Sequence, residues 1–178
     1  GNGYDEAGRL TTLTLLGGAP QGIQTVSYTY NGQGWLTSVT HARFSQTLRY
    51  NDAISPGLPR YNGDVSVMQW SPNASASTSG QRYIYTYDAL DRLTKAYAPW
   101  SYVTAEFAYD LNGNTTTIKR KGATDLEDLG YSEWGDIDDV TLTYEGNHIK
   151  KAADAAADLT YSGAMDFVDG SNTATEYF

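Results

Sequence analysis

The chain contains 178 residues with a formal net charge of −9, no cysteine and 15 tyrosines. The negative charge would repel phosphate backbones, so no nucleic-acid partner is expected, and the lack of cysteine excludes disulfides and thiolate metal sites. This length suits one sizeable core, and abundant tyrosine with short aliphatic runs favours sheets with one hydrated face. We therefore expect a single all-β domain over residues 1–178.

The first half of the sequence predicts successive β-hairpins. Side chains that alternate with a period of two indicate strands, and breaks rich in glycine or proline mark their ends. Asn31-Gly32 is a strong turn dipeptide, while Pro56 and Pro59 exclude a central strand between them. The predicted elements are a hairpin over residues 3–16, a second hairpin with strands at 23–30 and 35–44, a segment 47–50 that leads into a loop over 51–59, and a strand over 64–70.

The second half continues the pattern after the low-complexity loop 71–80. Hairpins are predicted over residues 81–97, over 102–118 around Asn112-Gly113, and over 140–152 around Gly146-Asn147. The acid-rich segment 122–139 is predicted as a solvated loop. Residues 152–158 have helical propensity but are too few to hold a helix, and 159–161 and 167–168 are predicted as short final strands.

One sequence motif recurs along the chain and is clearest at residues 83–97, YIYTYDALDRLTKAY. Its copies begin at Tyr4, Tyr30, Tyr87, Tyr109 and Tyr144, with weaker echoes at Tyr50 and Tyr161. Copies at roughly 20 to 35 residues indicate supersecondary units that are stabilised by stacking on their neighbours. The residues that define the repeat are Tyr4, Asp5, Gly8, Leu10, Tyr30, Gly34, Leu36, Tyr87, Asp88, Leu93, Tyr109, Asp110, Gly113, Tyr144 and Gly146.

The pattern Tyr-Asp-x-x-Gly-Arg-Leu, seen at residues 4–10 and with Asp91 in place of glycine at 87–93, resembles the YD repeat of the Rhs family. Residues 60–70 and 163–178 further resemble stretches of large Rhs proteins of Bacteroidetes. Trp35 in place of arginine and Thr115 in place of leucine are further departures, which make individual repeats irregular. The chain begins within a repeat and is interpreted as a fragment excised from a longer protein.

The resemblance implies a twisted, curved antiparallel sheet of consecutive hairpins, part of a hollow β-shell that encloses a C-terminal toxin or effector. It also implies a secreted or cell-surface parent protein whose adjoining repeats and C-terminal effector are partners of this segment. The expected function is therefore that of a non-catalytic structural module without a cofactor. Teneurins use a shell related to that of the Rhs family in adhesion.

Two alternatives remain open. Exposed aromatic residues can stack on sugars, so Trp100 and Tyr102 are candidate contacts in a carbohydrate-binding or cell-surface-binding module. Paired carboxylates can hydrolyse glycans, and Asp136 and Asp138 are the candidates within the acidic segment. Calcium-loop spacing is missing there, and neither His41 nor His148 lies near a nucleophile motif, so a metal site and catalysis are not expected.

Three structural expectations follow from the repeat. Gly32, Asn112, Gly113 and Gly146 should lie in tight turns, some with positive φ. The rings of Tyr30, Tyr87, Tyr109 and Tyr144 should pack against the adjoining hairpin, for example against Leu36 or Leu93. The first strand, near Tyr4, and the last, near Tyr177, should be open edges, and we expect the fragment to associate through them as a homo-dimer.

Overall fold

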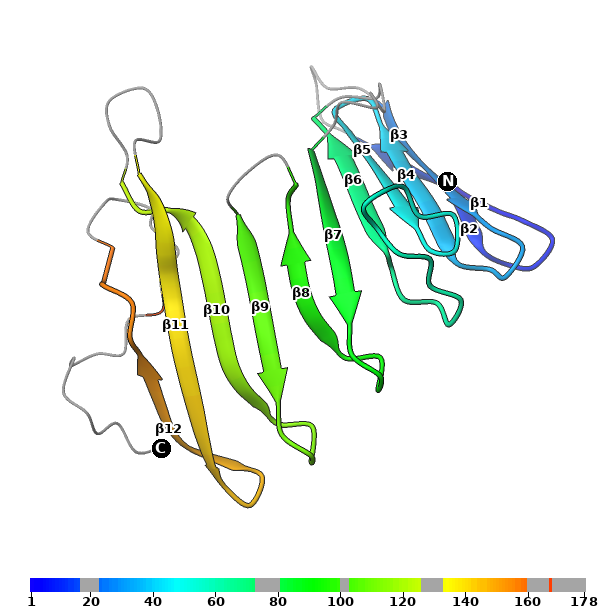
Figure 1. Ribbon diagram of the computed structural model, residues 1–178. Coiled ribbons are helices and arrows are strands. Elements are labelled where there is room, and N and C mark those ends of the chain that lie inside the picture. The colour runs from blue at the N-terminus through cyan, green and yellow to red at the C-terminus, as the bar shows by residue number, and fades with distance from the viewer. Residues whose placement is uncertain (17–22, 73–80, 100–102, 126–132, 160–166, 168–178) are drawn as a thin grey trace. The chain divides into compact units, whose positions relative to one another are not determined.

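The computed structural model describes residues 1–16, 23–72, 81–99, 103–125, 133–159 and 167. Within these ranges the chain forms twelve β-strands and no helix. The strands pair in chain order, from β1 to β12, in one open antiparallel sheet (Figure 1). The prediction of an all-β sheet of consecutive antiparallel hairpins is therefore confirmed. None of the described segments forms a helix of the length and apolar character that a membrane crossing requires.

The strands have the following bounds: β1 Asn2–Tyr4, β2 Leu10–Leu16, β3 Ile23–Tyr30, β4 Leu36–His41, β5 Phe44–Arg49, β6 Val67–Ser71, β7 Gln81–Tyr87, β8 Leu93–Tyr97, β9 Thr104–Tyr109, β10 Thr115–Ala123, β11 Trp134–Glu145 and β12 His148–Asp154. Because neighbouring strands are antiparallel, every second connection lies at the same edge of the sheet. In the second half of the chain, the connections β7–β8, β9–β10 and β11–β12 lie together at the lower edge in Figure 1. These three connections carry copies of the repeat.

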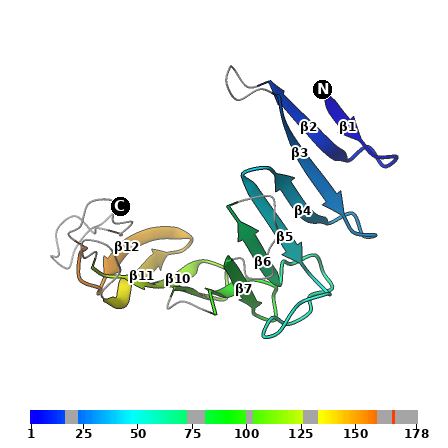
Figure 2. The same ribbon diagram turned by 90° about the horizontal axis from the view of Figure 1, so that it is seen from above.

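The chain divides into two compact units, Gly1–Ile84 and Tyr85–Phe178. In the first unit the strands follow one another from blue to green when seen from above (Figure 2). Its buried apolar residues are Tyr50, Val67 and Ile84, and the last two are direct partners on β6 and β7. Trp70 and Tyr83 stack on the opposite face of the same strand pair, with ring centroids 5.2 Å apart. Burial in this unit is therefore concentrated on β6, β7 and the end of β5.

In the second unit the two faces of the sheet differ, because side chains alternate between faces along each strand. The register aligns Phe107, Ile118 and Val140 across β9, β10 and β11, and Val140 is only 3% exposed. The other face carries a row of alternating charge, consisting of Lys95, Glu106, Lys119 and Asp139. Ion pairs of 2.7 Å and 2.9 Å join Lys95 to Glu106 and Lys119 to Asp139.

The predicted strand 35–44 is wrong at its end, because the chain turns back after His41. β4 ends at His41, a two-residue turn follows at Ala42 and Arg43, and Phe44 begins β5 opposite His41. The amide of Arg43 donates to Nδ1 of His41 at 3.2 Å, so a side chain closes this turn. Neither glycine, asparagine nor proline marks the position, which explains why turn residues did not reveal it.

The predicted acidic loop 122–139 is also wrong in part. β10 extends to Ala123 and β11 begins at Trp134, so Asp136, Asp138 and Asp139 lie in a strand. They face Lys121, Arg120 and Lys119 in the antiparallel register. Opposite charges directly across a strand pair stabilise a sheet, and this outweighs the turn preference of aspartate. The start of the predicted strand at residue 64 is corrected to Val67, and neither Leu159 nor Phe167 is in a strand.

Candidate functional site

The aspartate of the repeat closes a five-residue turn, which we name the Asp turn. Asp5 Oδ1 accepts hydrogen bonds from the amides of Ala7 (3.0 Å) and Arg9 (2.8 Å), and Oδ2 accepts one from Arg9 Nε (2.7 Å). The main chain closes the same turn, because the Asp5 amide donates to the Arg9 carbonyl at 2.9 Å. One carboxylate therefore satisfies two backbone donors and the arginine side chain.

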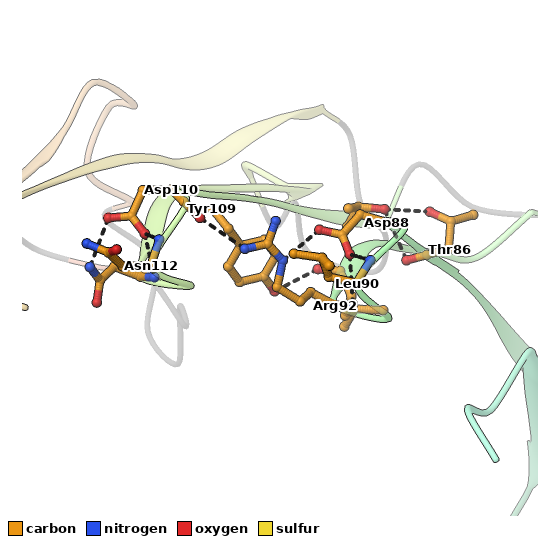
Figure 3. Close-up of polar contacts among 10 residues, drawn as sticks. Thr86, Asp88, Leu90, Arg92, Tyr109, Asp110 and Asn112 are labelled. Atoms are coloured by element: carbon orange, nitrogen blue, oxygen red, sulfur yellow. Dashed lines mark hydrogen bonds and ion pairs between the residues drawn. The ribbon is translucent and has the colours of Figure 1, made fainter. Parts of the chain in front are cut away.

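Two further turns repeat this arrangement in the second unit. Asp88 Oδ1 accepts from the amides of Leu90 and Arg92, and Oδ2 accepts from Arg92 Nε at 2.7 Å (Figure 3). Asp110 accepts from the amides of Asn112 and Asn114, and the Asn114 side chain takes the place of arginine at 2.8 Å. The Asp turn therefore tolerates different side chains at its fifth position provided the fifth amide is kept.

Asn31 makes the neutral version of the turn in the first unit. Its Oδ1 accepts from the amides of Gln33 (3.1 Å) and Trp35 (2.9 Å), so the backbone part of the turn is unchanged. Trp35 stands where arginine is found in the charged turns and cannot form an ion pair. Asn31 and Trp35 thus differ from the Asp88 and Arg92 pair at both positions, whereas the Asp110 turn changes only the fifth position, to Asn114.

The fourth residue of each Asp turn has positive φ. Gly8, Gly34 and Gly113 lie at 78°, 85° and 89°, and Asp91 adopts 59°. Glycine enters this region without steric cost, and aspartate is among the few other residues that do so readily. The prediction of positive φ at Gly113 and Gly146 is confirmed. In the Asn31 turn, Gly32 lies in the turn as predicted, but the positive φ belongs to Gly34.

These hydrogen bonds lower the pKa of the three carboxyl groups below the ordinary value of 3.8. The amide of Arg9 is the main cause at Asp5, and the amide of Arg92 is the main cause at Asp88. At Asp110 the side chain of Asn114 contributes most to the lowered pKa. Because the pKa of each lies below 3.8, all three carboxyl groups are ionised over the physiological pH range.

A β-bulge follows the turn at the same place in several copies. Tyr30 pairs with Leu36 while Thr29 pairs with Ser38, so Thr37 is the extra residue. The same shift leaves out Thr11 between the Tyr4–Leu10 and Gly3–Thr12 pairs. A bulge twists and bends a strand locally. The tyrosine, the turn and the bulge therefore recur together as one local motif.

Four of the tyrosines reach the preceding hairpin and form what we name the tyrosine joint. In each joint the tyrosine hydroxyl donates to the main-chain carbonyl of the residue at the leucine position of that hairpin. The four joints are Tyr30 to Leu10 (2.9 Å), Tyr50 to Leu36 (2.7 Å), Tyr109 to Leu93 (2.7 Å) and Tyr144 to Thr115 (2.7 Å). Because a backbone carbonyl is the acceptor, Thr115 replaces leucine in one joint without loss of the bond.

The fifth residue of the turn covers the ring of the next tyrosine. Cζ of Arg9 lies 4.8 Å from the ring centroid of Tyr30, and Cζ of Arg92 lies 4.7 Å from that of Tyr109. Arg92 also donates to the carbonyl of Asp110 at 3.0 Å, as Figure 3 shows. The predicted packing of Tyr30 and Tyr109 on the adjoining hairpin is confirmed, although the ring contact is with arginine. Sequence reasoning missed this role of the arginine.

Trp35 performs the same covering role in the turn that lacks arginine. Its ring and that of Tyr50 have centroids 5.0 Å apart and planes inclined at 47°. Tyr50 is the most buried of these tyrosines, at 5% exposure, and burial raises the pKa of its hydroxyl above 10.0. An aromatic ring thus substitutes for a guanidinium, since both pack against a tyrosine face.

The carboxylates considered for glycan hydrolysis are held by cations. Asp138 is 1% exposed, forms an ion pair with Arg120, and accepts a 2.9 Å hydrogen bond from the amide of Phe167. Asp136 pairs with Lys121 at 3.1 Å. Within the part of the chain that the structure describes, no cluster of three histidine or acidic residues is arranged for a metal ion. Trp100 and Tyr102, the candidate glycan contacts, lie outside the described residues.

Comparison with known proteins identifies the repeat. The family model RHS Repeat matches residues 4–43, which contain the Asp5 turn, the Asn31 turn and the joint between Leu10 and Tyr30. Over residues 4–43 the chain is therefore similar to an RHS repeat. No curated protein matches the chain.

Solved structures share the fold of the chain. A crystal structure of TcdB2-TccC3-Cdc42 is 14% identical with a TM-score of 0.60, and the alignment covers 86% of this chain and 8% of that one. A crystal structure of TcdB2-TccC3-TEV is also 14% identical, with a TM-score of 0.61 and coverage of 90% and 8%. The chain therefore spans less than a tenth of the length of these proteins, and it is a structural repeat module.

Proposed function

We propose that this chain is a wall segment of a larger RHS-type β-shell that encloses a C-terminal effector. The tyrosine joint is the observation that carries the proposal. Its hydrogen bond links one hairpin to the next at four places in the described chain. A wall made of one sheet layer has little core, so contacts between successive hairpins must supply much of its stability. The RHS repeat match and the shared fold support this reading.

The proposal includes the setting of the segment. Residues 1–178 act as one YD-repeat domain within a longer, secreted or cell-surface protein, and its partners are the adjoining repeats and the effector. The residues that define the repeat act structurally, through the Asp turn and the tyrosine joint. The short length relative to the similar solved proteins supports a larger parent protein.

The experiment measures protection of the effector in the full-length parent protein. Limited proteolysis should leave the C-terminal segment intact in the wild-type shell and cleave it faster when Arg92→Ala and Tyr109→Phe weaken one joint. Tyr61→Phe is the control, since Tyr61 is 76% exposed and belongs to no joint. Cleavage of the C-terminal segment at the same rate in the wild-type protein and as an isolated peptide would contradict the enclosing role.

A further inference from the structure

Tyr4 differs from the tyrosines that form joints. It is 60% exposed, whereas Tyr30, Tyr109 and Tyr144 are half-buried. Its hydroxyl accepts only a 3.4 Å contact from Asn2 Nδ2, and the described residues provide no carbonyl to which it donates. The reason is topological, because β1 is the first strand in the order of the sheet.

The β1 edge nevertheless has the local form of a strand that ends in a joint. Gly3 and Tyr4 show the register shift that Thr29 and Tyr30 show, so Tyr4 stands at the same place relative to its bulge and its Asp turn. The Tyr4 ring and hydroxyl are thus presented beside an unpaired strand edge. Such edges pair readily with another strand.

We propose that the β1 edge is a docking site for a β-hairpin closed by an Asp turn with glycine or aspartate at its fourth position and Arg-Leu after it. The second strand of that hairpin pairs antiparallel with β1. Tyr4 donates its hydroxyl to the main-chain carbonyl at the leucine position, and the arginine covers the Tyr4 ring. The occupant follows from continuity, because Tyr30 and Tyr109 each receive a hairpin with a leucine carbonyl and an arginine over the ring. The inference rests on the proposed structural function.

Docking that forms a tyrosine joint can be distinguished from strand pairing through backbone hydrogen bonds alone. A strand of any sequence can add backbone hydrogen bonds to β1, but those bonds do not involve the Tyr4 side chain. Joint formation requires the hydroxyl and the ring face together. Dependence of binding on the Tyr4 hydroxyl is therefore the distinguishing property.

The test titrates the full chain into a labelled, backbone-cyclised hairpin of sequence QRYIYTYDALDRLTKAY, which copies residues 81–97, and follows fluorescence anisotropy. We expect saturable binding, and Tyr4→Phe should raise the Kd about fivefold, the effect of one lost hydrogen bond. Tyr61→Phe should leave the Kd unchanged. A peptide with alanine in place of its arginine should bind the wild-type chain more weakly.

Two results would overturn the inference. The first is the absence of binding to a wild-type chain whose circular dichroism shows a folded sheet. The second is an equal Kd for the wild type and Tyr4→Phe, which would show plain edge pairing. Either result leaves the proposed function intact if urea unfolding shows that Tyr109→Phe destabilises the internal joint. If Tyr109→Phe has no effect, the proposed function fails as well.

Discussion

The hydroxyl of Tyr109 donates a 2.7 Å hydrogen bond to the main-chain carbonyl of Leu93, one hairpin earlier in the chain. Arg92, the residue before that leucine, covers the tyrosine ring and is itself held by Asp88. Two consecutive residues of one hairpin thus hold a single side chain of the next. This relationship makes the stability of neighbouring repeats interdependent.

Removal of the Tyr109 hydroxyl tests the joint. Tyr109→Phe keeps the ring under Arg92 and leaves the Leu93 carbonyl without its donor, so the free energy of unfolding should fall by about 1 kcal/mol. Urea denaturation followed by circular dichroism measures the change. Tyr61→Phe is the matched control, because that side chain is 76% exposed, and should have no measurable effect. Equal stability of the two variants would show that the joint is not a stabilising contact.

The ion pair between the first and fifth positions of the Asp88 turn gives a second prediction. Asp88→Asn keeps an oxygen for the two backbone amides but removes the charge opposite Arg92, and Arg92→Trp removes the cation opposite Asp88. Each single variant should lower the urea midpoint. The double variant copies the Asn31 and Trp35 pair, so its loss should be smaller than the sum of the single losses. Additive losses would mean that the two positions are independent.

The Asp turns also predict acid sensitivity. The folded pKa of Asp5, Asp88 and Asp110 lies below the ordinary value of 3.8. A depressed pKa contributes stability that is present above pH 3.8 and is lost as the pH falls through the folded pKa. The urea midpoint should therefore decrease below about pH 4, and less so in Asp88→Asn. An identical acid dependence of the urea midpoint in the wild type and the variant would show that Asp88 does not contribute to the acid sensitivity.

Asp138 and Asp136 should differ in their structural importance. Asp138 is buried with Arg120 and the amide of Phe167, so Asp138→Ala should cost roughly 1–3 kcal/mol of unfolding free energy. Asp136 is half-exposed in its pair with Lys121, and Asp136→Ala should cost about 0–1 kcal/mol. Urea unfolding distinguishes them. A reversed order would show that burial does not determine the contribution of these charges.

Association through the edge strands remains a prediction. β1 has an unpaired edge among the described strands, and the segment near Tyr177 lies outside the described residues. We expect the isolated chain to dimerise at high concentration, as open strand edges do. Light scattering measures the mass, and a strictly monomeric chain would contradict the expectation.

The repeat pattern predicted the fold well because its period of two and its turn glycines are local signals. Residues such as Asn112 and Gly113 mark a turn without knowledge of the rest of the chain. The β4–β5 turn was missed because His41 closes it with a side-chain hydrogen bond that no turn residue announces. The acidic segment was misassigned because its strand character depends on cations in β10.

The candidate site was less predictable for a physical reason. The sequence marks Tyr109 and Leu93 as repeat positions, but the acceptor is a main-chain carbonyl. Because every residue has such a carbonyl, the residue type does not reveal the acceptor. The arginine did leave a signal, because Arg9 and Arg92 occupy the same place after the turn. Its partner could be found only once the register between hairpins was known.

The central claim is that each hairpin is stabilised by the tyrosine of the next, and amide hydrogen exchange in Tyr109→Phe tests it most directly. The account predicts faster exchange at the amides of Leu90 and Arg92, which lie in the preceding Asp turn, as well as near residue 109. The Asp5 turn, far away in the chain, should exchange as in the wild type. Faster exchange confined to residues beside position 109, with the Asp88 turn unchanged, would contradict the claim.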